Sequence, residues 1–218
     1  MSEPFRTALA HARALDQQPR EDRILPSGHI ATIVTYLTME RPATLPKTAT
    51  LPDGLVLKDG HGHDLADHRA LFRQIGEDWL WTSRLVMADD RLEAILNDPA
   101  IERFLLEDAS GPCGLLELDF RNPAEVELAF LGLAPHRTGK GLGPALMAMA
   151  MERAWSRPET RSFFVHTCTF DHPAALSFYQ RFGFRPVLTH VEMIEDPRLN
   201  GLIRADAAPH VPLGIRPS

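Results

Sequence analysis

The sequence predicts an α/β fold, and three observations support this prediction. Segments with the β-branched or alternating pattern of strands are interleaved with segments of helical period. Three strand-like runs follow one another between residues 101 and 133, joined by short turns. A glycine-rich stretch then links the last run to an amphipathic helix. The order strand, two helices, three strands, helix, strand, helix, strand describes a mixed α/β sheet.

The individual elements follow from local patterns. The expected strands are residues 30–39, 55–58, 101–107, 113–120, 126–133, 163–169 and 184–194. The expected helices cover residues 64–97, 144–155 and 173–182. Within the first helical region, Gly76-Glu77-Asp78 is expected to break the helix, and residues 80–87 continue the helical pattern beyond it. Pro144 suits the first turn of its helix, where a missing N–H costs nothing.

The length of 218 residues suits one domain with extensions. Residues 1–28 are polar and contain one short helical pattern, so we expect an N-terminal extension. Residues 29–196 are expected to form the domain. Residues 197–218, with four prolines, are expected to be a C-terminal tail.

The composition of the chain argues against several classes of protein. The net charge of −6 argues against nucleic-acid binding, which needs a basic face. Cys113 and Cys168 are too few for a disulfide framework or a four-ligand metal site. No apolar run approaches the ~20 residues of a membrane span, and no secretory leader is visible, so we expect a cytoplasmic protein. His61 and His63 stand in a Gly/Asp-rich stretch typical of a loop, and we expect no metal there.

Three glycines at alternate positions, Gly139, Gly141 and Gly143, form the most informative motif. They lie between an apolar strand and a helix N-terminus, where backbone N–H groups and the helix dipole favour a phosphate. The spacing fits neither a P-loop nor a Rossmann fingerprint. Taken alone, the motif is also compatible with a flexible connection.

Three blocks resemble the GNAT superfamily of acyl-CoA-dependent N-acetyltransferases. Residues 131–135 and 138–143, Leu-Gly-Leu-Ala-Pro and Thr-Gly-Lys-Gly-Leu-Gly, look like the family's pyrophosphate loop, Gln/Arg-x-x-Gly-x-Gly/Ala. Residues 172–179, His-Pro-Ala-Ala-Leu-Ser-Phe-Tyr, look like its Asn-x-x-Ala-x-x-Leu/Phe-Tyr block, and Gly183-Phe184 matches the Gly-Phe that follows. The resemblance is good from about residue 101 to 194.

This resemblance implies a GNAT-type α/β fold with a mixed, mostly antiparallel central sheet flanked by helices and splayed fourth and fifth strands. It implies acetyl-CoA as cosubstrate and an amine as acceptor. Backbone groups of residues 131–133 would pair with the cofactor like an added strand. The cofactor-binding residues would be Leu131, Leu133, Arg137, Thr138, Gly139, Lys140, Gly141, Leu142, Gly143, Pro144, His172 and Tyr179.

Two positions depart from the family pattern. Thr138 stands where the family has Gln or Arg, and Arg137 comes one residue earlier. Because backbone N–H groups do most of the pyrophosphate binding, either Arg137 or Lys140 can supply the cation. His172 replaces the family's Asn, which leaves open how the pantetheine end and the tyrosine are held.

Tyr179 is the candidate for protonating the leaving thiolate. A phenol of pKa about 10 is protonated at neutral pH and can donate toward a thiolate whose conjugate acid has a pKa near 8.5. Ala175, Phe178, Tyr179 and Phe182 also form a stripe that is usually core. The matching family block favours the catalytic role.

Glu127 is the candidate for the base that deprotonates the amine. Alternation places Glu125 and Glu127 on one face of the 126–133 strand, opposite Val126. Many family members carry an acidic residue on this strand that acts through water. A solvent-facing carboxylate is the competing interpretation, and His166 and His172 are rival bases.

Three further residues have two interpretations each. Cys168 could carry an acyl group, but a small buried hydrophobe is the more usual role. Trp79 and Trp81 lie in the region that forms the acceptor pocket in relatives, and they suit either a pocket or the core.

The leading hypothesis is an N-acetyltransferase that uses acetyl-CoA and a primary amine through direct attack in a ternary complex. The alternative is a catalytically silent acyl-CoA-binding sensor or interaction module. Transfer to a hydroxyl acceptor is a third, weaker idea. Dimerisation is common among relatives, so a homodimer is also an expectation.

Overall fold

Strands and helices follow one another in the predicted order. The strands are β1 (His29–Glu40), β2 (Val56–Asp59), β3 (Ile101–Asp108), β4 (Gly111–Asp119), β5 (Glu125–Leu133), β6 (Ser162–Cys168) and β7 (Arg185–Glu195). The α-helices are α2 (Leu65–Gly76), α3 (Asp89–Leu96), α4 (Leu142–Trp155) and α5 (Ala175–Arg181), with 3₁₀ turns η1 (Glu77–Trp79) and η2 (Pro135–Arg137). Apart from residues 80–87, these bounds agree with the predicted segments within a few residues.

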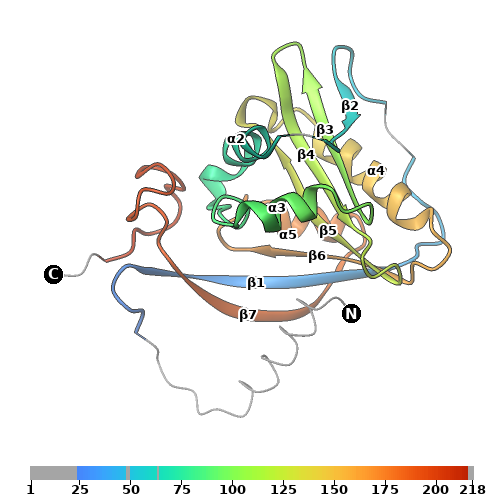
Figure 1. Cartoon of the computed structure of the whole chain (residues 1–218). Helices are drawn as coiled ribbons and strands as arrows, with labels where there is room; N and C mark the ends of the chain where they lie inside the picture. Colours follow the sequence, from blue (N-terminus) through green and yellow to red (C-terminus); the bar gives the residue numbers. More distant parts are fainter. Residues whose placement is uncertain (1–23, 48–49, 63, 216–218) are drawn as a thin grey trace. The chain divides into compact units, whose positions relative to one another are not determined.

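The computed structural model describes residues 24–47, 50–62 and 64–215 (Figure 1). The chain divides into two units. The first unit contains residues up to Met39, Asp78–Leu80, and Phe164 onward; the second contains Glu40–Glu77 and Trp81–Phe163. The short helical pattern predicted near the N-terminus and the predicted loop residue His63 lie outside the described residues.

The second unit is built on an antiparallel sheet of β2, β3, β4 and β5, in that order. Turn residues 109–110 join β3 and β4 into the predicted hairpin. The pairing of β4 with β5 changes register between Glu117 and Leu118, which are opposite Phe130 and Leu128, so Ala129 is an extra residue on β5. Such a bulge bends a strand locally and is common beside functional sites.

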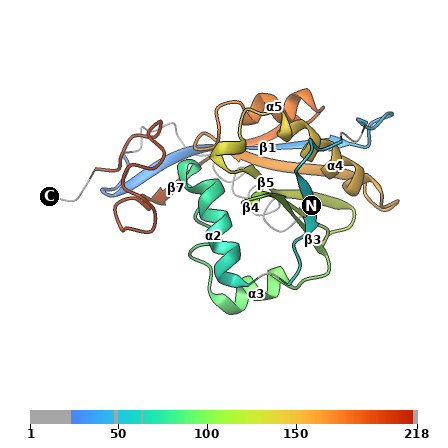
Figure 2. The same ribbon diagram turned by 90° about the horizontal axis from the view of Figure 1, so that it is seen from above.

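Helices cover both faces of this sheet, because β3 and β4 carry apolar side chains on both faces. Figures 1 and 2 show α2 and α4 on opposite faces of β3–β5. Leu105 and Leu115 pack with Phe72 of α2. The next residue of β3, Leu106, packs with Cys113 of β4 and Leu142 of α4. Side chains of a strand point alternately to its two faces, which explains the opposite positions of Leu105 and Leu106. On β4, the pairing with β3 changes register between Gly114 and Pro112, so Cys113 is an extra residue there and packs on the face opposite to Leu115.

The helical prediction for residues 80–87 is wrong, because this segment forms turns between η1 and α3. Leu80 has a positive φ of 56°, which ends the preceding turn. Arg84 then donates to Glu117 at 2.6 Å, and both side chains are buried. Arg69 donates to the carbonyls of Arg84 and Met87. Long-range hydrogen bonds thus replace the helical ones that local periodicity predicted.

The first unit places β1 between β6 and β7. β1 pairs antiparallel with β7 along nearly its whole length, and the two long strands lie side by side in Figure 1. Val34 and Tyr36 of β1 pack with Phe164 of β6 to form a core. The N-terminal strand is therefore an interior strand of this unit.

Arg198 organises residues 196–212, which belong to the first unit. Its guanidinium donates to both oxygens of Asp196 at 2.8–2.9 Å. It also donates to a series of backbone carbonyls, those of Ala207, Ala208, Val211 and Pro212. One buried ion pair, Arg198 with Asp196, thus organises the described part of the predicted tail. The domain boundaries predicted at residues 28 and 196 stay predictions.

The predicted fold class is confirmed: the protein is α/β, its strand pairs are mostly antiparallel, and helices flank the sheet. The splay of the family's fourth and fifth strands, which correspond to the predicted strands 126–133 and 163–169 and thus to β5 and β6, stays a prediction because most of β6 belongs to the other unit. Among the described residues, no helix is both long and apolar enough to cross a membrane.

Candidate functional site

The glycine loop begins where β5 ends, in the second unit. After Ala134, the turn η2 leads into Thr138, whose N–H donates to the carbonyl of Ala134 at 3.2 Å. The Thr138 hydroxyl donates to the same carbonyl at 3.3 Å. Thr138 therefore closes the turn, whereas the matching family position carries a long polar or cationic side chain.

Gly139 and Gly141 provide the backbone conformation of the loop. Both have φ of 76°, the left-handed region that L side chains rarely adopt. Gly141 is the N-cap of α4, which starts at Leu142. No atom lies within 4 Å of a Cβ built on either glycine, so conformation rather than crowding requires glycine here. Gly143 already lies inside the helix.

The first turn of α4 carries N–H groups that have no partner inside the helix. They belong to Leu142, Gly143 and Ala145, because Pro144 has none. The helix dipole makes this end electropositive. The predicted arrangement of strand, glycine turn and helix N-terminus is present, and it has the features of an anion-binding site.

The two cations of the loop have different surroundings. Arg137 donates from Nε and Nη2 to one oxygen of Asp108, at 2.8 and 2.5 Å. The hydrogen bonds from Arg137 hold the pKa of Asp108 well below its usual range. Lys140 is exposed and forms no ion pair with any described residue. Arg137 is thus already engaged, and Lys140 is the cation that remains for a ligand.

Leu131 and Leu133 lie at the end of β5 and are partly buried. They pair with Leu116 and Gly114 of β4. Between them, a Cβ on Gly132 would clash with Ile75 and with the Trp81 ring. Glycine at position 132 therefore lets α2 and Trp81 approach the strand closely. Close packing, and not a turn of the backbone, requires glycine at this position.

Glu127 lies six residues before Leu133 on β5, roughly 20 Å along the strand. It is partly buried and opposite Asp119. Its charge acts on Arg121, which also donates to Asp119. The predicted alternation is present, since Val126 and Leu128 are buried and Glu125 and Glu127 are less so.

Tyr179 lies on α5, in the first unit, and is 8% exposed. Its ring contacts Phe178 and Phe184. Burial raises the pKa of Tyr179, and the negative charge of Asp171 adds to that effect. Within residues 24–47, 50–62 and 64–215, its hydroxyl has no hydrogen-bond partner. The ring is therefore part of the core, as the helical stripe predicted, and the catalytic role of the hydroxyl stays a prediction.

Three aromatic rings from distant segments of the first unit meet in what we call the ring cluster: Trp79, His172 and His210. The Trp79 ring centroid lies 5.1 Å from that of His172 and 5.4 Å from that of His210. His210 bonds the carbonyl of Phe170 at 2.9 Å, and His172 accepts from the N–H of Ala174 at 3.1 Å. Both histidines are exposed.

The structure separates the two tryptophans that the sequence left undecided. Trp81 packs in the core of the second unit against Phe72 and Phe130. Trp79 belongs to the ring cluster. His210 was missed, because it lies in a proline-rich segment without a period; no local signal marks it.

His166 and Cys168, the remaining candidate residues, are engaged in contacts with neighbouring side chains. The His166 ring contacts that of Tyr36 at 5.4 Å. Cys168 is partly buried, and burial raises the pKa of its thiol. Its N–H donates to Asp171. These contacts favour the structural interpretation of Cys168.

The chain matches a known protein family. A family model described as the acetyltransferase (GNAT) family matches residues 68–184. A conserved Staphylococcus epidermidis protein of unknown function has a similar structure, with 14% identity and a TM-score of 0.58 over 90% of this chain and 68% of that one. A search of functionally curated proteins finds no significant match.

Two GCN5-related N-acetyltransferases also have similar structures. The one from Kribbella flavida has 19% identity and a TM-score of 0.50, over 78% of this chain and 60% of that one. The one from Sphaerobacter thermophilus has 12% identity and a TM-score of 0.52, over 86% and 57%. The match thus spans between 57% and 68% of these three structures. At these identities the likeness concerns the fold alone.

The family model settles membership. Its match, residues 68–184, covers more than half of the 218 residues. It contains strands β3, β4 and β5, the glycine loop, α4 and α5. The chain belongs to the GNAT family of acetyltransferases.

Proposed function

We propose that the protein transfers an acetyl group from acetyl-CoA to a primary amine, by direct attack in a ternary complex. The observation that carries this proposal is the glycine turn at the N-terminus of α4, with Gly139 and Gly141 both at φ 76°. That turn presents backbone N–H groups at the electropositive end of a 14-residue helix. Family membership supplies the general reaction class.

The chain's own groups fit a pyrophosphate at this turn. The N–H groups of Leu142 and Gly143 would donate to phosphate oxygens, and the open space at Gly139 and Gly141 would let a phosphate approach the backbone. Lys140 would add a mobile positive charge. Arg137 would hold the turn to the β3–β4 hairpin through Asp108, or exchange that carboxylate for phosphate.

Leu131 and Leu133 would hold the pantetheine arm through their backbone groups, and His172 would contact its far end. The bulge at Ala129 lies two residues before Leu131 and supports this role, because a bulge interrupts regular pairing and redirects backbone groups. When bound, acetyl-CoA supplies an activated thioester carbonyl.

Tyr179 would stabilise the departing thiolate. Its hydroxyl is protonated throughout the physiological pH range because burial raises its pKa. As the amine nitrogen bonds the carbonyl carbon and the carbon–sulfur bond breaks, Tyr179 would donate to sulfur. The protonated amine would lose one proton to Glu127 through water before it attacks. As the amide forms, nitrogen would lose a second proton, which restores the Tyr179 hydroxyl after it has protonated sulfur. The proton on Glu127 would pass to solvent, so that acetylation of an ammonium releases one proton in all.

The ring cluster supports a cationic acceptor. The Trp79 indole packs against the rings of His172 and His210, and a protonated amine is attracted to an indole face more than to other aromatic rings. The protein's negative net charge of −6 acts in the same direction. A place in the cytoplasm, a homodimer and the absence of nucleic-acid partners complete the proposal and rest on the sequence.

An assay of acetyl transfer tests the proposal. The full chain is incubated with acetyl-CoA and with a polyamine, an aminoglycoside, an amino acid and a polyol in turn. Free thiol and the mass of the acceptor are measured. Amine-dependent thiol release with a gain of one acetyl group supports the proposal. Cofactor binding without turnover on any acceptor indicates the sensor instead, and turnover on the polyol alone indicates O-acetylation.

A further inference from the structure

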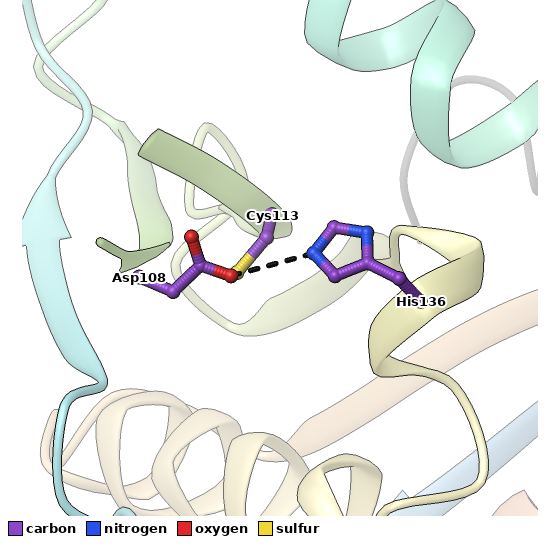
Figure 3. Close-up of side chains that lie close together, drawn as sticks. All are labelled: Asp108, Cys113 and His136. Atoms are coloured by element: carbon purple, nitrogen blue, oxygen red, sulfur yellow. Dashed lines mark hydrogen bonds and ion pairs between the residues drawn. The ribbon is translucent and has the colours of Figure 1, made fainter. Parts of the chain in front are cut away.

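Asp108, Cys113 and His136 bring three kinds of metal-ligating atom to one place in the second unit. Asp108 is the last residue of β3, Cys113 lies on β4, and His136 is in the middle of η2. Figure 3 shows the three side chains pointing toward one another. The proposed acetyl transfer uses none of them directly.

The distances among the ligand atoms suit one ion. A carboxylate oxygen, the thiol sulfur and an imidazole nitrogen all lie within 4.8 Å of one another. His136 Nε2 lies 3.3 Å from Asp108 Oδ2. In a tetrahedral zinc site with metal–nitrogen and metal–oxygen bonds of about 2.0–2.1 Å, the nitrogen–oxygen edge is about 3.3 Å. The carboxylate and imidazole are therefore already at the separation that a shared ion requires.

The surrounding backbone holds these ligands in place. The N–H of Ser110 donates to Asp108 Oδ1 at 2.7 Å, which orients the carboxylate and leaves Oδ2 toward the cluster. The N–H of Ala134 donates to the carbonyl of Cys113 at 2.8 Å, which fixes the start of η2 to β4. Hydrogen bonds of this kind orient the ligands of metal sites.

Exposure differs among the three side chains in a way that gives an ion access. Cys113 is 1% exposed and the Asp108 side chain 5%, whereas the His136 side chain is 52% exposed. An ion would enter on the His136 side and bind the thiolate at the bottom of the cluster. The Cys113 thiol would lose its proton to solvent as the sulfur–metal bond forms.

Arg137 competes for this site. Its guanidinium donates twice to Asp108 Oδ2, the same oxygen that is near His136. A metal ion would have to replace that guanidinium at the carboxylate. The ion pair and the metal site are thus two alternative states of Asp108.

The chemistry of the ligands selects the class of ion. A thiolate with an imidazole and a carboxylate suits a borderline-soft divalent ion of the zinc type. Magnesium and calcium prefer oxygen ligands only. We infer that Asp108, Cys113 and His136 form a binding site for a zinc-type divalent ion, with Arg137 occupying the carboxylate when the ion is absent.

Titration of the full chain with Co²⁺ tests this inference, because cobalt bound to a thiolate gives a charge-transfer absorption band. The variants are C113S, H136Q, R137Q and, as matched control, C168S, which removes the protein's other thiol. We expect a saturable band with one equivalent in the wild type and C168S, its loss in C113S, and weaker binding in H136Q. R137Q should bind Co²⁺ more tightly, because it removes the competing cation.

Circular dichroism of each variant separates loss of binding from loss of folding. His136 is exposed, so H136Q provides a second test if C113S does not fold. A band that persists in C113S, or that disappears in C168S, would overturn the inference. So would the absence of a band in both the wild type and R137Q.

Discussion

The glycine loop and the ring cluster differ in the part of the chain that would recognise a ligand. The loop offers backbone N–H groups, whose directions depend on Gly139 and Gly141 in the left-handed conformation. The ring cluster offers side chains, brought together from residues 79, 172 and 210. The glycine loop is determined within a dozen consecutive residues, whereas the ring cluster depends on the folding of three distant segments.

This difference has consequences for substitution. A backbone site tolerates changes of side chain and fails when the backbone conformation changes. A side-chain site fails when one ring is removed or when the segment carrying it is released. Matched variants separate these two kinds of failure.

The largest effect is expected at Tyr179. Replacement by Phe keeps the buried ring and removes the donor, so kcat should fall by about 10²–10⁴-fold, the usual contribution of a positioned acid. Affinity for acetyl-CoA should change little. Steady-state kinetics and calorimetry measure the two quantities. Y36F, at the only other tyrosine, is the control. Unchanged kcat in Y179F would remove Tyr179 from the mechanism.

Arg198 should have the next largest effect, through stability. R198M leaves the buried Asp196 unpaired and frees the carbonyls of residues 207–212, so unfolding free energy should fall by about 3–5 kcal/mol. Chemical denaturation measures this. R204M is the control, because Arg204 forms exposed ion pairs worth about 0–1 kcal/mol. Equal losses in the two variants would contradict the anchoring role of Arg198.

A smaller effect is expected at His210. H210A removes a ring that packs against the Trp79 indole. Loss of a cation–π contact with that indole, about 0.5–1 kcal/mol, corresponds to a rise of roughly 2–5-fold in KM for a cationic acceptor. The value of kcat should stay close to that of the wild type. H190A, whose ring stacks on Tyr36, serves as control. The idea fails if H210A leaves KM unchanged for every amine that is turned over.

The smallest effect is a pH dependence of stability. Burial alone would raise the pKa of Asp196, but hydrogen bonds from Arg198 and from the N–H of Gly214 outweigh it and lower the pKa. A lowered carboxyl pKa stabilises the fold above the unfolded value of about 3.9, and this contribution is lost as pH falls through the folded pKa. The melting temperature should therefore fall less steeply with acid in D196N than in the wild type. Parallel curves from pH 6 to 2 would contradict this.

The sequence predicted most elements because their patterns are local. The strands of the 101–133 series are largely apolar runs separated by turn residues, and the glycine turn is continuous in the chain, so both could be read directly. The structure of residues 80–87 could not be predicted in this way. Their helical period competes with the buried pair of Arg84 and Glu117, which are 33 residues apart in the sequence.

Contacts between distant residues also kept parts of the candidate sites from being predicted. The pairing of Arg137 with Asp108 joins η2 to the end of β3, and an Asp in a hairpin is ordinary turn chemistry in the sequence. The bulge at Ala129 leaves no mark in the apolar run of β5. His210 depends on Arg198, which organises a segment that lacks any period.

Isothermal titration with acetyl-CoA tests the central claim, that the glycine turn before α4 binds the cofactor. Three forms of the full chain are compared: wild type, G141E and G54E. Gly54 also has a positive φ, 81°, and open space around it, so G54E introduces the same side chain with the same kind of backbone strain elsewhere. We predict micromolar binding in the wild type and G54E, and its loss in G141E. No binding by the wild type, or equal binding by all three forms, would contradict the claim.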